Sequence, residues 1–219
     1  MIRAVIFDMD GVMIDSEPLW EKTERILLGR RGIDYNPDYR DKIVGLNQRD
    51  SGMLLKETFS LPETVEELLE ERSEILLSLY ENELELAPGL LPLLKELGEN
   101  EFLLALASSS PYRIIKFVLN KFSLNQFFRV VISGDFVQLG KPNPDIYLHT
   151  AKELGIDTAE CVVIEDSING LKSAKAAGML CIAVPDKRLK QEEFRIADLV
   201  VDRLDEINIH LIRNLSGKG

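Results

Sequence analysis

The stretch VIFDMDGVMIDSEPLW, residues 5–20, begins as an apolar strand and stops at two aspartates that are one residue apart. These aspartates, Asp8 and Asp10, are followed at once by Gly11, where the chain can turn. Helix capping does not explain the pair, because no helical pattern starts at either aspartate. Two carboxylates at the end of a buried strand therefore indicate a chemical site.

Length and charge narrow the class of protein. The chain has 219 residues, of which 45% are hydrophobic, so one core domain with an insertion fits best. The formal net charge of -11 repels nucleic-acid phosphates and anionic membranes, and we expect neither as a partner. No apolar stretch approaches the roughly 18 residues of a spanning helix, and acidic residues stand where a signal peptide needs apolar ones. We expect a cytoplasmic monomer.

Alternating strands and helices predict the fold. Short apolar runs typical of buried parallel strands occupy residues 3–7, 102–107, 130–133, 161–165 and 180–184. Amphipathic stretches typical of helices occupy residues 111–122, 144–155 and 167–178. This alternation predicts an α/β protein with a doubly wound, Rossmann-like parallel sheet. Cys161 and Cys181 lie near the starts of two of the apolar runs, and neither belongs to a metal-binding or redox motif, so we expect buried thiols.

The first two strands are separated by about 95 residues, far more than a crossover needs. Helical patterns lie near residues 17–30, 37–43, 47–58 and 62–80, with no convincing strand between them. We therefore predict an inserted all-helical cap, residues 15–82, on a catalytic core of residues 1–14 and 83–219. In this architecture ligands bind in the crevice beyond the carboxyl ends of the strands.

Polar residues follow three of the predicted strands: Asp8 and Asp10, Ser108 to Ser110, and Glu165 with Asp166. Because parallel strands end at one edge of a sheet, four carboxylates could meet there. Such a cluster repels itself unless a hard cation holds it, and oxygen ligands favour Mg²⁺. Ordinary helix capping is the alternative for Ser108 to Ser110 and for Asp166.

Lys141 lies in the loop GKPNPD, residues 140–145, and alone it is compatible with a solvated loop lysine. Placed opposite the carboxylates, it could hold an anion. The anion that needs both Mg²⁺ and a lysine is a phosphoryl group.

Four motifs carry a resemblance to a known family. They are DMDGV (8–12), LASSS (106–110), GKPNPDIY (140–147) and VIEDSINGLKSAKAAG (163–178). In this order and spacing they resemble the haloacid dehalogenase superfamily, in its sugar-phosphatase and β-phosphoglucomutase-like branch with a helical cap. The resemblance extends over nearly the whole chain. It implies phosphoryl transfer through a covalent aspartyl intermediate.

The resemblance also implies individual roles. Asp8 would be the nucleophile that becomes a phosphoaspartate, and Asp10 the general acid and base. Mg²⁺ would be held by Asp8, the backbone carbonyl of Asp10 and Asp166, with Glu165 as a further ligand. Mn²⁺ or Co²⁺ would substitute for it in vitro.

The transferring phosphoryl group would be bound by Ser108, the backbone around Ser109 and Lys141. The ligand implied is a small phosphorylated substrate. The general function we predict is therefore Mg²⁺-dependent hydrolysis of small phosphorylated metabolites, with hexose phosphates as the preferred class.

The cap departs from the mutases that it resembles. Trp20 stands where they have a histidine, and Gln48 aligns with their arginine, although Arg49 is adjacent. The segment 61–87 contains Arg72 but no lysine. The last cap helix of the mutases, in contrast, supplies a lysine. These groups would hold a second phosphate, so their absence favours hydrolysis.

Alternatives stay open at this point. Trp20 could pack the cap helix or stack on a sugar ring, and four other aromatic residues are expected in the cap core: Tyr35, Tyr39, Phe59 and Tyr80. A sugar-phosphate mutase is the second function. A non-catalytic binding protein is the third function. Such a protein would be expected to have lost one of the four residues Asp8, Asp10, Lys141 and Asp166, and all four are present.

Overall fold

The computed structural model describes residues 1–36, 39, 43, 46, 48–185 and 191–215. Their strands form one parallel six-stranded sheet in the order β3-β2-β1-β4-β5-β6. The strands are β1 (Ala4–Phe7), β2 (Leu103–Ser108), β3 (Val130–Ser133), β4 (Cys161–Glu165), β5 (Leu180–Ala183) and β6 (Leu199–Val200). The predicted doubly wound α/β fold is thereby confirmed.

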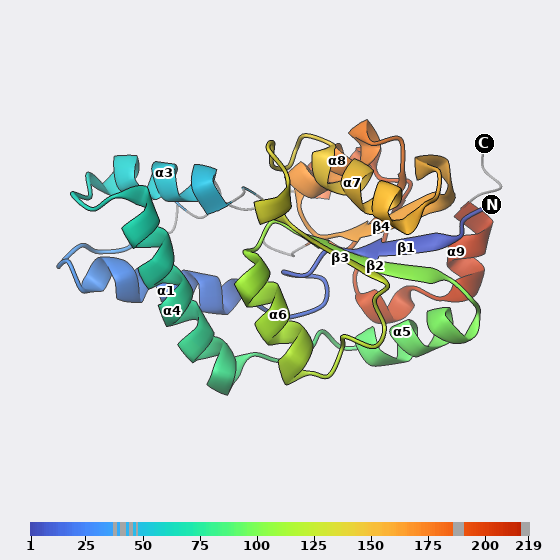
Figure 1. The fold of residues 1–219 in the computed structure, drawn as a ribbon, viewed down its shortest axis with the longest axis horizontal. Helices are drawn as coiled ribbons and strands as arrows, with labels where there is room; N and C mark the ends of the chain where they lie inside the picture. Colours follow the sequence, from blue (N-terminus) through green and yellow to red (C-terminus); the bar gives the residue numbers. More distant parts are fainter. Residues whose placement is uncertain (37–38, 40–42, 44–45, 47, 186–190, 216–219) are drawn as a thin grey trace.

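Helices cover both faces of the sheet (Figure 1). One face carries α7 (Asp145–Leu154) and α8 (Ile168–Ala176), and the other carries α5 (Leu90–Glu99), α6 (Tyr112–Lys121) and α9 (Ile209–Leu215). Alternate residues of each strand point to opposite faces. In β1, for example, Val5 and Phe7 join one buried cluster while Ala4 and Ile6 join the other.

Three further helices form a group at one end of the sheet, at the left of Figure 1. They are α1 (Glu17–Gly29), α3 (Gln48–Phe59) and α4 (Val65–Glu83). They share a separate apolar cluster that includes Leu27, Leu55 and Leu68. Tyr39 and Phe59 lie in this cluster with ring centroids 5.2 Å apart, as expected for cap-core residues.

The chain passes between the sheet and this helical group through two segments that lie side by side. The backbone nitrogen of Asp15 donates to the carbonyl of Glu85 at 3.2 Å, and that of Ala87 donates to the carbonyl of Met13 at 2.9 Å. These crossing points lie close to the predicted boundaries at residues 14/15 and 82/83. The division into core and cap remains our proposal, supported by the paired segments and the separate apolar cluster.

Some elements differ from the sequence-based expectations. Helices α5 and α9 and the short strand β6 were not predicted, and 3-10 turns cover Gly134–Phe136, Thr158–Glu160, Gln191–Ile196 and Leu204–Glu206. The helix expected at residues 37–43 falls mostly outside the described residues. Cys161 and Cys181 are free, buried thiols, as predicted.

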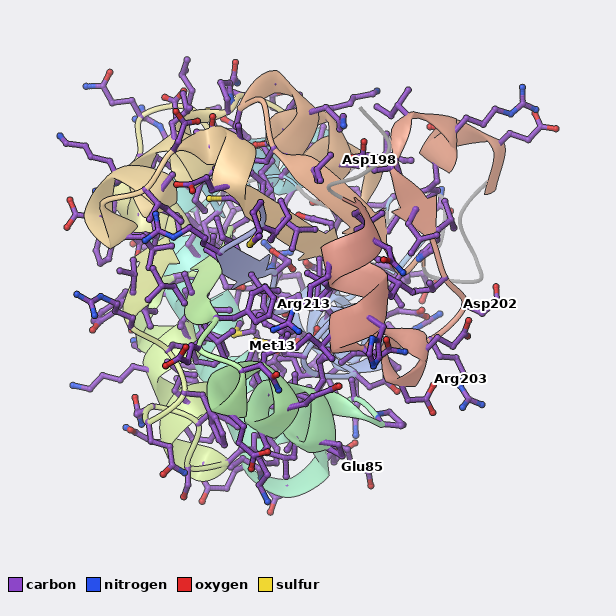
Figure 2. All side chains as sticks on the ribbon, turned by 90° about the vertical axis from the view of Figure 1, so that its right-hand side faces the viewer. Met13, Glu85, Asp198, Asp202, Arg203 and Arg213 are labelled. Atoms are coloured by element: carbon purple, nitrogen blue, oxygen red, sulfur yellow. The ribbon has the colours of Figure 1, made fainter. Side chains whose placement is uncertain are left out.

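Figure 2 views the end of the core that is farthest from α1, α3 and α4. Asp202 and Arg203 project outward there, and both are exposed. The Arg213 guanidinium lies 6.0 Å from the ring centroid of Phe102. Asp198 accepts hydrogen bonds from Lys175 and from the backbone of β5. Among the described helices, none has the length and apolar character that crossing a bilayer requires.

Candidate active site

The carboxyl ends of β1, β2 and β4 meet at one edge of the sheet. Phe7, the last residue of β1, is in register with Leu106 of β2 and Ile164 of β4. The backbone nitrogen of Asp8 extends this pairing by donating to the carbonyl of Ile164 at 3.0 Å. The polar residues after the three strands are therefore neighbours, as predicted from the parallel arrangement.

Lys141 is the centre of the polar cluster. Its Nζ lies 2.6 Å from Oδ1 of Asp8 and 2.6 Å from Oε1 of Glu165. The lysine is only 4% exposed, so it is not the solvated loop residue of the alternative interpretation. A buried ammonium group needs such partners, because unpaired burial of a charge is very costly.

Both oxygens of Glu165 are occupied by protein donors. Oε1 accepts hydrogen bonds from Lys141 and from the Tyr147 hydroxyl at 2.8 Å. Oε2 accepts from the backbone nitrogens of Asp166 and Ser167 and from the Ser167 hydroxyl, each at 3.0 Å. This fully bonded carboxylate acts as an anchor that fixes Lys141 beside Asp8.

The remaining carboxylates are not balanced by one lysine. Burial, together with Glu165 and Asp10, raises the pKa of Asp8 to about 8 although Lys141 opposes the shift. Burial, together with the negative charges of Glu165, Asp8 and Glu17, raises the pKa of Asp166 well above its ordinary value. Burial acts to raise the pKa of Glu165, but Lys141 and the hydrogen bonds from Ser167 and Tyr147 together outweigh burial and lower the pKa of this carboxyl. The ionised forms of Asp8 and Asp166 are thus disfavoured unless further positive charge is bound beside them.

Asp10 is held by donors from both parts of the molecule. Its Oδ2 accepts hydrogen bonds from the hydroxyls of Ser110 at 2.7 Å and Ser108 at 3.4 Å, which lie at and just after the end of β2. Its Oδ1 accepts from Trp20 Nε1 at 2.9 Å and from the Tyr80 hydroxyl at 3.2 Å, which lie on α1 and α4. The side chain of Asp10 therefore joins the helical group to the sheet edge.

Gly11 allows Asp166 to approach the loop after β1. Its φ is +77°, a left-handed conformation that glycine adopts without strain. A Cβ at this position would lie 2.0 Å from Oδ2 of Asp166. The carboxylate of Asp166 thus packs directly against the backbone that follows Asp10, which explains the glycine in DMDGV.

A pocket opens between the sheet edge and the helical group, with an empty volume of about 750 Å³ that includes open solvent. The predicted residues in its lining are Asp8, Asp10, Trp20, Gln48, Ser108, Ser109, Lys141 and Asp166. Two predicted residues are not in this lining. Glu165 lies outside it in full burial, and Arg49 lines a different hollow beside Asp135 and Gly140.

The residues implied as Mg²⁺ ligands provide few carboxylates and only oxygen donors. Among the residues that the structure describes, no group of three or more His, Cys, Asp or Glu side chains is arranged to hold a metal ion. The set implied for Mg²⁺ needs only two carboxylates, of Asp8 and Asp166, together with the backbone carbonyl of Asp10. All are hard oxygen donors. The raised pKa values of the Asp8 and Asp166 carboxyls fit a divalent cation at this point, because such a cation would stabilise their ionised forms.

The sequence did not reveal several residues of the pocket. Tyr80 was expected only as cap core, yet its hydroxyl reaches Asp10. Glu24 and Arg72 were not predicted as site residues, and both are buried in the pocket lining. The sequence did contain a signal for these two residues. Glu24 lies on the same face of α1 as the buried Leu27, and Arg72 lies on the same face of α4 as the buried Leu68, so each is a charged residue on an apolar helix face.

The chain is similar to known proteins of one family. A family model described as haloacid dehalogenase-like hydrolase matches residues 5–184. Hexitol phosphatase B of Escherichia coli (strain K12) is 34% identical over 216 residues, covering 94% of both chains. A phosphorylated carbohydrates phosphatase of Thermotoga maritima is 34% identical over 81% of this chain and 82% of its own. The crystal structure of β-phosphoglucomutase from Clostridium difficile superimposes with a TM-score of 0.88 at 26% identity, covering 100% of this chain and 98% of the other.

Proposed function

The chain belongs to the haloacid dehalogenase-like hydrolases, in the branch of sugar phosphatases, and on this basis we propose that it hydrolyses hexose or hexitol monophosphates through a phosphoaspartate. One observation carries the proposal. Lys141 lies 2.6 Å from Asp8 and is fixed by Glu165, so a buried carboxylate and a cation stand together at the pocket. A phosphoryl group requires this pairing of a nucleophile with positive charge.

In the first step an oxygen of Asp8 attacks the phosphorus, and the bond from phosphorus to the substrate oxygen breaks. Asp10 donates a proton to that oxygen, so the product leaves as a neutral alcohol. In the second step Asp10 takes a proton from water, which attacks the same phosphorus. Inorganic phosphate is released and the carboxylate of Asp8 is restored. The hydroxyl donors around Asp10 orient its carboxylate for both transfers.

Positive charge and hydrogen-bond donors in the pocket support binding of the transferring group. Lys141, the Ser108 hydroxyl and the backbone around Ser109 line the pocket and would bind the phosphoryl oxygens. Mg²⁺ at Asp8, Asp166 and the carbonyl of Asp10 would supply further charge stabilisation. The two occupied oxygens of Glu165 favour an anchoring role for this residue over direct ligation.

A β-phosphoglucomutase-like mutase is the second candidate, because the fold superimposes on such an enzyme. A mutase must bind a second phosphate while a bisphosphate reorients. Within the described pocket lining the cap side includes the neutral Gln48 and Trp20 and the paired Arg72 and Glu24, and Arg49 is not included. This composition favours hydrolysis. The presence of Asp8, Asp10, Lys141 and Asp166 also speaks against a non-catalytic binding protein.

A substrate panel tests the proposal. The purified protein with Mg²⁺ would be assayed for phosphate release from hexose and hexitol monophosphates, from other phosphorylated metabolites and from an aryl phosphate. We expect release that stops in excess chelator and returns on addition of Mg²⁺, with hexose or hexitol monophosphates among the best substrates. Full activity in chelator would contradict the metal assignment, and absence of phosphate release from every compound would contradict the function.

A further inference from the structure

Helices α1 and α4 place a charged pair in the pocket that the proposed chemistry does not use. Glu24 is 1% exposed and Arg72 is 3% exposed, and both line the pocket. Nη2 of Arg72 lies 2.5 Å from Oε1 of Glu24. Removing two charges from water is costly, so a buried pair in a pocket wall calls for a functional explanation.

The hydrogen bonds of this pair are incomplete. Arg72 Nη1 donates to the hydroxyl of Ser51 at 2.8 Å, and its guanidinium lies 4.7 Å from the ring centroid of Trp20. The contact with Glu24, in contrast, lacks the alignment of a hydrogen bond. Within the described part of the chain, neither carboxylate oxygen of Glu24 has a hydrogen-bond partner, and Nε of Arg72 has none.

Buried polar atoms without partners are rare, because leaving one unpaired is costly, and more so when the group is charged. Glu24 combines full burial, a place in the pocket lining and two carboxylate oxygens that accept no hydrogen bond from the described residues, although Oε1 is in an ion pair with Arg72. A ligand that donates hydrogen bonds would satisfy these oxygens. Hydroxyl groups are such donors, whereas the oxygens of a phosphate dianion accept only.

The charge of the pocket lining on α1, α3 and α4 also favours a ligand with hydroxyl groups over one with a second phosphate. Glu24 offsets the charge of Arg72, and the lining also includes the carboxylates of Glu17 and Glu21. Gln48 adds no charge. The described lining on α1, α3 and α4 therefore has no excess positive charge that would attract a second phosphate.

We propose that Glu24 determines substrate specificity by accepting hydrogen bonds from hydroxyl groups of the part of the substrate that is not transferred. Its pairing with Arg72 also withholds that cation from a distal phosphate. The ligand class is a monophosphate with an uncharged polyhydroxylated chain or ring. This inference rests on the proposed phosphatase function and names the substrate feature that the pocket recognises.

The test compares three substrates in the wild type and in Glu24→Gln: a hexitol monophosphate, a hexose bisphosphate and an aryl phosphate without hydroxyl groups. For the hexitol monophosphate we expect kcat/KM to fall roughly 10- to 100-fold, because a site built for hydroxyls is left with a poorer acceptor. For the aryl phosphate we expect a change below about threefold. Relative to the hexitol monophosphate, kcat/KM for the bisphosphate should rise about fivefold or more as Arg72 becomes available.

A matched control is Glu71→Gln, since Glu71 is also a cap glutamate paired with arginine but does not line the pocket. We expect it to leave the ratio of hexitol monophosphate to aryl phosphate turnover unchanged. The double variant Glu24→Gln/Arg72→Gln removes both charges, so the loss for the hexitol compound should persist while the relative gain for the bisphosphate disappears. Circular dichroism and thermal unfolding check that each variant is folded.

If a glutamine variant does not fold, Glu24→Asp carries the test, because it keeps the charge and withdraws the carboxylate by one methylene. The ratio of hexitol monophosphate to aryl phosphate turnover should then fall about fivefold. An unchanged ratio of hexitol to aryl phosphate turnover in the folded variants would overturn the role of Glu24 while leaving the phosphatase function intact. A wild type that hydrolyses neither substrate would instead overturn the proposed function.

Discussion

The two walls of the pocket treat their buried charges differently. On the sheet side, Glu165 accepts five hydrogen bonds and fixes Lys141 against Asp8. On the side of α1 and α4, Glu24 and Arg72 form an ion pair in which three polar atoms lack a hydrogen-bond partner among the described residues. The anchor on the sheet side, Glu165, has both carboxylate oxygens hydrogen-bonded, whereas among the described residues the carboxylate of Glu24 has no hydrogen-bond donor.

This difference suggests a division of labour. Chemistry that is the same for every phosphomonoester benefits from a rigid, fully bonded frame, because preorganised groups need no rearrangement during the reaction. Selection among substrates benefits from groups that only the right ligand satisfies. The hydrogen bond from Trp20 to Asp10 connects the two walls. Each of the following predictions tests this comparison, beginning with the largest effect.

Asp8→Asn should remove activity toward every substrate. The amide is a poor nucleophile, so we expect turnover to fall by roughly 10⁴-fold or more for a hexitol monophosphate and for an aryl phosphate alike. Acid quenching after incubation with a ³²P-labelled substrate should yield labelled wild-type protein but unlabelled variant. A labelled variant would show that another residue attacks the phosphorus.

Gly11→Ala should also damage the sheet-side wall. The new methyl group would lie 2.0 Å from Oδ2 of Asp166, and the φ of +77° would add backbone strain. We expect about a 100-fold loss of turnover, since displacements near 1 Å can have this effect. The loss should again be equal for both substrates.

The matched control for this change is Gly98→Ala, on the exposed surface of α5, where a Cβ would have no neighbour within 4 Å. We expect it to retain wild-type activity and to stabilise the fold by up to about 1 kcal/mol. Steady-state kinetics and thermal unfolding measure both effects. Near-normal activity of Gly11→Ala would contradict the close approach of Asp166.

Trp20→Phe should have a smaller effect than Asp8→Asn or Gly11→Ala, because it removes one of the four hydrogen bonds that described residues donate to Asp10 and keeps an aromatic ring in the pocket. We expect a loss of about three- to tenfold in kcat. Tyr80→Phe, which removes the longer bond to the same oxygen, is the comparison variant and should lose less. If Trp20→Phe leaves kcat unchanged for every substrate, the connection between the two walls has no role in proton transfer.

Much of the fold and of the sheet-side site was predictable from the sequence. Parallel strands are short apolar runs, and their carboxyl ends share an edge, so the convergence of Asp8, Asp10, Ser108 and Glu165 follows from local patterns. The short strand β6 was not predictable, because its two residues carry no periodic signal. Helices α5 and α9 were also not predicted.

The pocket wall formed by α1 and α4, the cap-side wall, was harder to predict because it depends on how these helices pack. The pairing of Glu24 with Arg72 joins residues that are far apart in the chain, and only the packing of α1 against α4 brings them together. Tyr80 illustrates the same limit. Its burial was expected, but the contact of its hydroxyl with Asp10 depends on how α4 meets the sheet edge.

The most direct test of the whole account follows the products formed from β-glucose 1-phosphate with a trace of the 1,6-bisphosphate. A mutase must hold a second phosphate and protect its phosphoaspartate from water, and the described cap-side wall has no excess positive charge for that purpose. We therefore predict that glucose and inorganic phosphate accumulate, with little glucose 6-phosphate, when products are followed by ³¹P NMR. Conversion to glucose 6-phosphate much faster than phosphate release would contradict the account.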